Sequence, residues 1–283
     1  MACLSQQGGS YDADQDICVY PPPYECRDGD PPTEITFSEA STTSGSGYSN
    51  LGGQGPDVSK PEFMRLSNVG TSITGDPFDL LIYTTSSYEP TRASLNRVNE
   101  GKFGVINLKA GTKVDLVFEF IDSSIDEAIQ VSQFDFTFYD FDQRQNGEQR
   151  ELLYIEGFNT FSVTETTEVA IYMPVGGGKT EFSSSTYGTG TDNPSDPVEL
   201  TRQQRDRSVE FTFKDTSSFS LTLEVQGSGL GRNFMFAGHS FYLPPCLPPP
   251  PPSLPPPSPS GPPIPPPTVP PSNPPPIVPP PSQ

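Results

Sequence analysis

Hydrophobic and polar residues alternate with a period of two along much of residues 33–243. In FDFTFYDF (134–141) the phenylalanines at 134, 136 and 138 fall on one side of an extended chain and the residues between them on the other. Successive side chains of a β-strand point to opposite faces, so this spacing indicates a strand. Similar runs predict strands at residues 34–38, 78–84, 103–109, 113–121, 133–141, 151–156, 161–164, 168–173, 208–214, 218–225 and 233–243.

Helix signals are few, because β-branched and aromatic residues dominate the periodic runs. We expect short helical turns at 124–127, where Ser124 and Glu127 have capping-box spacing, and at 200–204, which follows Asp196-Pro197. Gly-, Ser-, Asn- and Asp-rich stretches separate the strands, as turns do. The predicted fold class is all-β, an antiparallel, jelly-roll-like β-sandwich.

Proline divides the chain into parts of different character. Residues 244–283 hold 24 of the 36 prolines and no charged residue. Proline fixes φ and removes a backbone donor, so this tail is expected to adopt polyproline II rather than to pack a core. We therefore predict three parts: a Cys- and Pro-rich N-terminal arm (1–32), a β-sandwich head (33–243) and a proline-rich tail (244–283).

The net charge of −19, from 35 acidic and 16 basic residues, argues against a nucleic-acid partner and against an anionic membrane surface. No apolar run approaches the roughly 18 residues of a membrane helix, so we expect no membrane span. The sequence as given has no signal peptide at its start, because it lacks a basic start followed by an apolar stretch.

Four cysteines stand near the two ends of the head, at Cys3, Cys18, Cys26 and Cys246. An even number so placed predicts two disulfides and an oxidising compartment, although the sequence leaves three pairings open. A zinc site is the rival interpretation, but it lacks a CxxC pair, and four reduced thiols are the simplest alternative.

Catalytic chemistry has little support in the sequence, and we expect no enzyme. His239 is the only histidine, and it lies within a predicted strand. No cofactor is required by any motif. The one candidate is a structural Ca²⁺, because two oxygen-rich segments carry Asp140, Asp142, Asp192 and Asp196. We favour the simpler interpretation, in which these acidic loops are solvated.

The proline tail admits two interpretations. Tracts of this kind inside cells bind the aromatic grooves of SH3 or WW modules, whereas extracellular ones are hydroxylated and glycosylated. The chain has no Asn-x-Ser/Thr sequon, so any glycan would be O-linked.

The join GRNFMFAGHSFYLPPCLPPPPPSLPPPSPSGPP, together with FDFTFYDFDQ and DNPSDPVELTRQQRDRSVEFTF, resembles algal-type hydroxyproline-rich extracellular glycoproteins. Pherophorin-like and mastigoneme-type proteins share this layout, and subunits of freshwater glycosylated fibrils resemble it most. The resemblance implies a helical extracellular fibril of identical subunits with O-linked glycans on hydroxyproline. The matching prolines are Pro249, Pro250, Pro251, Pro252, Pro255, Pro256, Pro257, Pro265, Pro266, Pro267, Pro274, Pro275 and Pro276.

The sequence thus favours an extracellular structural subunit of a glycosylated fibril or cell-surface coat. The alternative is a secreted carbohydrate-binding, lectin-like module on a glycosylated stalk. Loop tyrosines at Tyr48, Tyr88 and Tyr187, if exposed, would serve that alternative by stacking on sugar rings.

Overall fold

A computed structural model describes residues 10–12, 17–19, 33–38, 40–43, 46–72, 75–99, 102–175 and 177–238. The chain divides into two compact units, Met1–Pro248 and Pro249–Gln283, and all of the described residues lie in the first. The predicted tail, 244–283, falls outside them, as does most of the predicted arm.

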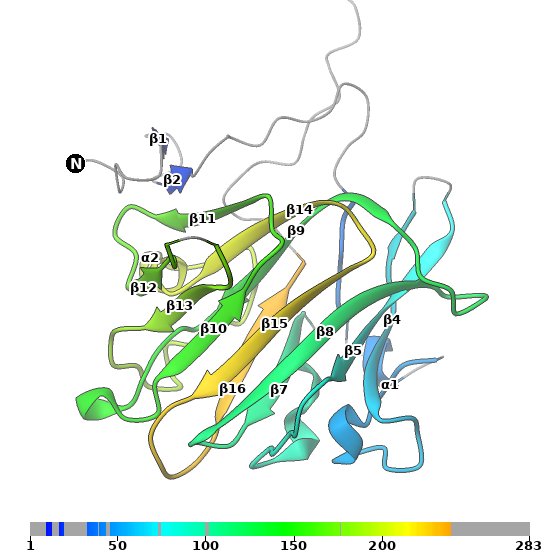
Figure 1. Cartoon of the computed structure of the whole chain (residues 1–283), viewed down its shortest axis with the longest axis horizontal. Coiled ribbons are helices and arrows are strands. Elements are labelled where there is room, and N and C mark those ends of the chain that lie inside the picture. The colour runs from blue at the N-terminus through cyan, green and yellow to red at the C-terminus, as the bar shows by residue number, and fades with distance from the viewer. Residues whose placement is uncertain are drawn as a thin grey trace, which may run out of the picture. The chain divides into compact units, whose positions relative to one another are not determined.

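The described residues form two eight-stranded sheets in which every neighbouring pair is antiparallel (Figure 1). Two short strands of sheet A come from the predicted arm, and the other strands come from the predicted head. Sheet A has the order β1 (Ser10–Asp12), β2 (Ile17–Val19), β11 (Thr160–Thr164), β14 (Val209–Thr216), β9 (Val131–Tyr139), β16 (Arg232–Ala237), β7 (Phe103–Leu108) and β6 (Arg97–Asn99). Sheet B has the order β12 (Val169–Tyr172), β13 (Thr180–Ser184), β10 (Glu151–Ile155), β15 (Ser218–Val225), β8 (Thr112–Asp122), β5 (Pro77–Thr84), β4 (Phe63–Thr71) and β3 (Tyr48–Ser49).

From β7 to β16 the chain crosses to the other sheet at every connection except the β12–β13 hairpin. Such crossing is typical of jelly-roll-like sandwiches, because consecutive strands then face each other across the core. The predicted fold class, an all-β antiparallel sandwich, is confirmed.

Ten of the eleven predicted strands are present, as β5, β7 to β12 and β14 to β16. Residues 34–38 are not a strand, although Ile35 and Phe37 are buried. The prediction also missed β1, β2, β3, β4, β6 and β13. In β4 the alternation is interrupted, because the register with β5 shifts between Leu66 and Gly70.

Helical structure in the described ranges is short. The expected helix at 124–127 is wrong: Asp122 Oδ1 accepts hydrogen bonds from the Ser124 and Ile125 amides and holds a turn instead. The second expectation is realised slightly later in the chain as α2 (Arg202–Asp206), where Thr201 and Gln204 form a capping box. The remaining short elements are α1 (Ala40–Thr43), η2 (Leu51–Gly53), η3 (Ala93–Leu95) and η4 (Gln145–Gly147).

A layer of phenylalanine rings fills the space between the sheets. Phe136 of β9 has ring centroids within 5.1–5.6 Å of Phe118, Phe219 and Phe236, which come from both sheets. Phe37, from the segment before α1, closes the layer at 6.2 Å from Phe136. Such packed aromatic pairs stabilise a core beyond the area that they bury.

Both faces of β9 are buried, not only the phenylalanine face. Asp135 accepts a 2.8 Å hydrogen bond from Thr212 of the neighbouring β14, and Tyr139 donates to the Pro197 carbonyl at 3.2 Å. The loop between β13 and α2 therefore reaches over the outer face of sheet A at Tyr139. The alternation correctly predicts that β9 has an apolar face and a more polar face. The polar face, however, is buried and not exposed to solvent.

The first test concerns the phenylalanine layer. Phe136→Ala is expected to lower the free energy of unfolding by about 3–5 kcal/mol, because it leaves a cavity among rings from both sheets. Tyr187→Ala, which removes an exposed ring, is expected to change it by less than about 0.5 kcal/mol. Urea denaturation of both full-length variants measures the difference, and equal losses would contradict this account of the core.

Candidate functional site

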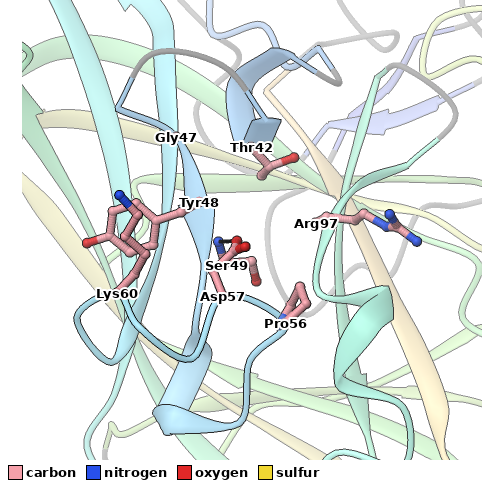
Figure 2. Close-up of a pocket in the computed structure, with 8 residues that line it drawn as sticks. All are labelled: Thr42, Gly47, Tyr48, Ser49, Pro56, Asp57, Lys60 and Arg97. Atoms are coloured by element: carbon pink, nitrogen blue, oxygen red, sulfur yellow. Dashed lines mark hydrogen bonds between the residues drawn. The ribbon is translucent and has the colours of Figure 1, made fainter.

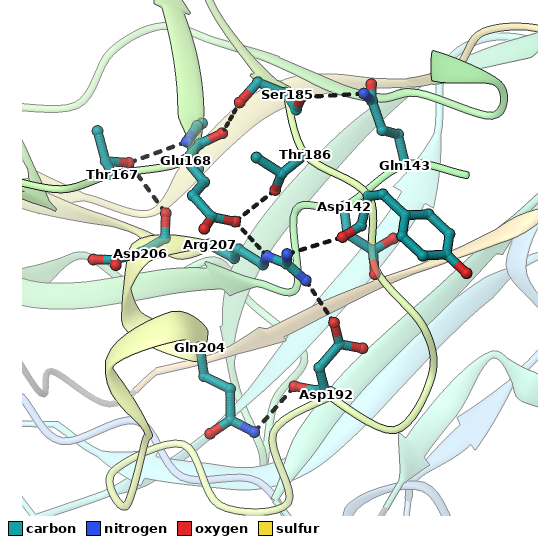
Figure 3. Close-up of polar contacts among 12 residues, drawn as sticks. Asp142, Gln143, Thr167, Glu168, Ser185, Thr186, Asp192, Gln204, Asp206 and Arg207 are labelled. Carbon is teal, nitrogen blue, oxygen red and sulfur yellow. Dashed lines mark hydrogen bonds and ion pairs between the residues drawn. The ribbon is translucent and has the colours of Figure 1, made fainter. Parts of the chain in front are cut away.

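The predicted Ca²⁺ ligands lie beside a network of buried charges. Asp140 and Asp142 follow β9, and Asp192 and Asp196 lie in the loop between β13 and α2. Figure 3 shows the side chain of Arg207 between Glu168 and Asp192. Its Nε is 2.7 Å from Glu168 Oε2 and its Nη1 is 2.6 Å from Asp192 Oδ2.

Arg232 is the second cation of this network, and it joins the two sheets. It lies on β16 of sheet A, and its Nε donates to Glu151 Oε1 of sheet B at 2.8 Å. Its other end forms an ion pair with Asp142. Because Glu151 and Asp142 are both only 2% exposed, the arginine compensates two carboxylates that water does not reach.

These pairings limit what the four aspartates can bind. Asp142 pairs with Arg232, Asp192 with Arg207, and Asp196 with Lys102. Within the described ranges, no group of three or more His, Cys, Asp and Glu side chains is arranged to hold a metal ion. The Ca²⁺ site stays a prediction. Three of its four proposed ligands already have a lysine or arginine side chain beside them.

Burial shifts the acid–base behaviour of the network. It raises the pKa of Asp140 to about 7, although Arg232 and Arg207 act in the opposite direction. Burial also raises the pKa of Glu151, and the nearby Asp140 adds to that increase. Burial lowers the pKa of the Arg232 guanidinium. The network thus holds one carboxyl group, that of Asp140, whose protonation changes near neutral pH.

Sequence reasoning missed Glu151, Glu168, Arg207 and Arg232. Nothing in their local pattern distinguishes them from surface charges, because their partners are distant in sequence: Arg232 is 81 positions from Glu151, and Arg207 is 39 positions from Glu168. The one signal lay in composition, because a chain with 16 basic and 35 acidic residues is expected to pair some of its few cations with carboxylates.

A separate groove lies between β3 and β6, the edge strands at one side of the two sheets (Figure 2). Its volume is about 370 Å³, and it is lined by Thr42, Gly47, Tyr48, Ser49, Pro56, Asp57, Lys60 and Arg97. Figure 2 shows Tyr48 and Lys60 on one side and Arg97 on the other, with Ser49 and Asp57 between them. The lining mixes apolar surface with hydroxyl, carboxylate, ammonium and guanidinium groups, so the groove suits a small ligand that has polar groups.

Two contacts order the centre of this groove. Asp57 Oδ2 accepts a 2.8 Å hydrogen bond from the Ser49 amide, and Lys60 Nζ lies 5.7 Å from the centre of the Tyr48 ring. The Ser49 hydroxyl oxygen is buried and has no hydrogen-bond partner in the part of the chain that the structure describes. A buried hydroxyl of this kind could accept a water or ligand group as its partner.

The expectation of three exposed tyrosines is mostly wrong. Tyr48 and Tyr88 are buried, and the Tyr88 hydroxyl donates to the Asn107 carbonyl at 2.6 Å. Burial raises the pKa of Tyr88. Tyr187 is 56% exposed and is the one member of the three available for stacking.

Several predicted residues fall outside what the structure describes. Cys18 lies in β2, where its backbone is opposite Val163 of β11. Cys3, Cys26, Cys246, His239 and all of the tail prolines lie outside the described residues. The disulfide pairing therefore stays open.

No protein-family model matches this chain, and no curated protein matches it. Among solved structures, the N-terminal domain of an adhesin from Streptococcus gordonii is 10% identical with a TM-score of 0.41, covering 78% of this chain and 59% of that one. The adhesin domain of PrgB from Enterococcus faecalis is 14% identical with a TM-score of 0.37, covering 62% and 63%. The chain thus spans less than two thirds of either structure, and likenesses at these TM-scores carry no argument about function. Over the described ranges, no helix is both long and apolar enough to cross a membrane.

Removing Arg232 tests the network. Arg232→Ala is expected to lower the free energy of unfolding by about 3–5 kcal/mol, because it leaves Glu151 and Asp142 buried without their cation. Lys109→Ala removes the exposed ion pair with Glu89 and is expected to cost less than about 1 kcal/mol. Chemical denaturation at neutral pH measures both. Similar losses would show that the Arg232 bridge is no stronger than a surface pair.

The raised pKa of Asp140 predicts a pH dependence. Because the folded state holds this proton up to about pH 7, Asp140 destabilises the fold progressively as pH rises from about 4 to about 7. Asp140→Asn keeps a residue suited to the left-handed backbone there (φ 63°) and removes the titration. Urea midpoints at several pH values should fall less steeply in the variant than in the wild type. Parallel curves would contradict the assignment.

Proposed function

We propose that this protein is a non-enzymatic structural subunit of a glycosylated extracellular fibril or cell-surface coat. Identical subunits assemble helically through their β-sandwich heads and their tails, and the tails carry O-linked glycans on hydroxylated prolines. The observation that carries the proposal is the uncharged segment 244–283, with 24 prolines in 40 residues, attached to an all-β domain.

The length of the tail supports assembly. As polyproline II, 40 residues extend on the order of 120 Å, at about 3.1 Å per residue. A rod of that length reaches well beyond one small domain, and a stiff segment loses little conformational entropy when it docks. A contact from the tail of one subunit to the next head does not close on itself, so it propagates as a filament.

Charge sets a condition on this assembly. The chain carries a net charge of −19, and two of its cations, Arg207 and Arg232, are used inside the head to neutralise the protein's own carboxylates. Close packing of subunits therefore brings acidic surfaces together. Salt or Ca²⁺ would favour assembly by screening that repulsion.

A carbohydrate-binding module on a glycosylated stalk is the second candidate. The groove between β3 and β6 favours it, because its hydroxyl, carboxylate and cationic side chains can form hydrogen bonds with sugar hydroxyls. This candidate predicts that the full chain binds glycans on an array and that native material shows no fibres.

Native material tests the leading proposal. Intact-mass spectrometry is expected to show increments of about 16 Da for hydroxylation, together with pentose or hexose increments, and peptide mapping should place them within 244–283. Negative-stain electron microscopy is expected to show fibres. An unmodified tail, or modified but dispersed single particles, would overturn the proposal.

A tail variant tests the stiff segment together with the three predicted glycan carriers within it. Replacing Pro265, Pro266 and Pro267 with serine keeps length and charge but interrupts the stiff segment. Exchanging Thr268 and Val269 with each other is the matched control, because it leaves every proline in place. If the rod is an assembly element, the first variant forms fewer or shorter fibres than the second in electron micrographs.

A further inference from the structure

The groove between β3 and β6 carries two cations that have no carboxylate partner. Lys60 and Arg97 line it from opposite sides (Figure 2). Neither forms an ion pair within the described part of the chain, although the sequence has 35 acidic residues for 16 basic ones. Asp57 is the one carboxylate among the lining residues, so two positive charges and one negative charge leave the groove locally positive in an acidic protein.

The carboxylate of Asp57 is held in place by one oxygen and presents the other. Its Oδ2 accepts the 2.8 Å hydrogen bond from the Ser49 amide. Its Oδ1 has no hydrogen-bond partner among the described residues. An ionised carboxylate only accepts hydrogen bonds, so Oδ1 calls for a ligand group that donates one, such as a hydroxyl.

The hydroxyl of Ser49 is the independent sign of a ligand. Ser49 is 1% exposed and lines the groove, and its Oγ has no hydrogen-bond partner in the described ranges. Buried polar atoms are normally hydrogen-bonded, so an unpartnered one at the wall of a groove needs an explanation. A ligand hydroxyl satisfies it, because a hydroxyl group both donates and accepts hydrogen bonds.

The loop that carries these groups is fixed by its own hydrogen bonds. Asn50 Nδ2 donates to the Lys60 carbonyl at 2.6 Å, and Asn50 Oδ1 accepts from the Gly55 amide at 2.8 Å. The Asp57 amide also donates to the Ser49 carbonyl at 2.8 Å. The backbone positions of Ser49, Asp57 and Lys60 are therefore set before a ligand arrives, which lowers the entropic cost of binding.

We propose that this groove binds a sugar acid, which is a sugar ring that carries one carboxylate group. The carboxylate pairs with Lys60 or Arg97, one ring hydroxyl donates to Asp57 Oδ1, and another ring hydroxyl meets the Ser49 hydroxyl. The groove volume of about 370 Å³ accommodates a ligand of this size. The inference rests on the second candidate function, carbohydrate binding, which it narrows to acidic sugars, and it is independent of the fibril proposal.

The charges of the groove select a single carboxylate over the other small ligands. A neutral sugar leaves Lys60 and Arg97 unpaired, whereas a phosphate brings a larger negative charge close to Asp57. One carboxylate matches the one excess positive charge of the groove. The net charge of −19 opposes any anion at long range, but physiological salt screens it beyond about 8 Å, so the charges that line the groove decide.

Matched pairs of sugars test the ligand class. Isothermal titration calorimetry of the full-length protein compares glucuronate with glucose and galacturonate with galactose, because the members of each pair differ only in the carboxylate. At least one acid is expected to bind about tenfold more tightly than its neutral counterpart, and more tightly than inorganic phosphate. Equal binding of acid and neutral sugar, tighter binding of phosphate, or no binding of either acid would overturn the proposal.

Variants test the site. A double variant, Lys60→Gln with Arg97→Gln, is expected to bring the Kd values of the acid and its neutral counterpart to within about twofold, because it removes both cations. Lys113→Gln, at an exposed lysine of β8, is the matched control and should keep the preference of the wild type. A preference that survives in the double variant would overturn the assignment.

The outcomes separate this inference from the functions proposed above. Neutral glycans that bind on the array without any preference for sugar acids would overturn the sugar-acid site and leave the second candidate function standing. The presence or absence of fibres in native material bears only on the leading proposal.

Discussion

The layer of phenylalanine rings between the two sheets is the interaction on which the rest of the structure depends. Phe118 and Phe219 enter it from sheet B, and Phe136 and Phe236 enter it from sheet A, so neither sheet can bury its apolar face alone. The chain has 19 phenylalanines and no tryptophan, so one ring shape supplies most of this contact. The rings meet in edge-on and stacked pairs at the centre of the sandwich. Polar groups can therefore lie at the margins of the sandwich, outside this ring layer.

Two of the few cationic side chains of this acidic protein lie at those margins. Arg207 and Arg232 are directed inward, where each meets two carboxylates. A buried carboxylate without such a partner would be strongly destabilising. Because these two cations are used internally and the net charge is −19, the head keeps an excess of carboxylates that opposes close association of subunits. Close contact between copies then depends on screening of that charge.

Much of the strand pattern could be predicted because it is local. The sequences of β8, β9, β14 and β15 alternate clearly, and both ends of each strand lie within two residues of their expected positions. The sequence pattern did not predict the strands in which hydrophobic and polar residues fail to alternate clearly. In β4 a register shift interrupts it, and in β13 the sequence TEFSS is too short and polar to stand out. The helix expected at 124–127 became a turn because Asp122 binds the amides that the helix would have used.

The sequence by itself determined the fold class and the contrast between an acidic β head and an uncharged proline tail, because side-chain alternation and the fixed φ of proline act within a few residues. It also drew attention to the aspartates that follow β9. Only the tertiary structure decided what those aspartates contact. Arg232 meets Glu151 across 81 positions of sequence, and strand pairing alone brings them together. Among the described strands, the position of β12 at the end of sheet B likewise follows from strand order and not from any local motif.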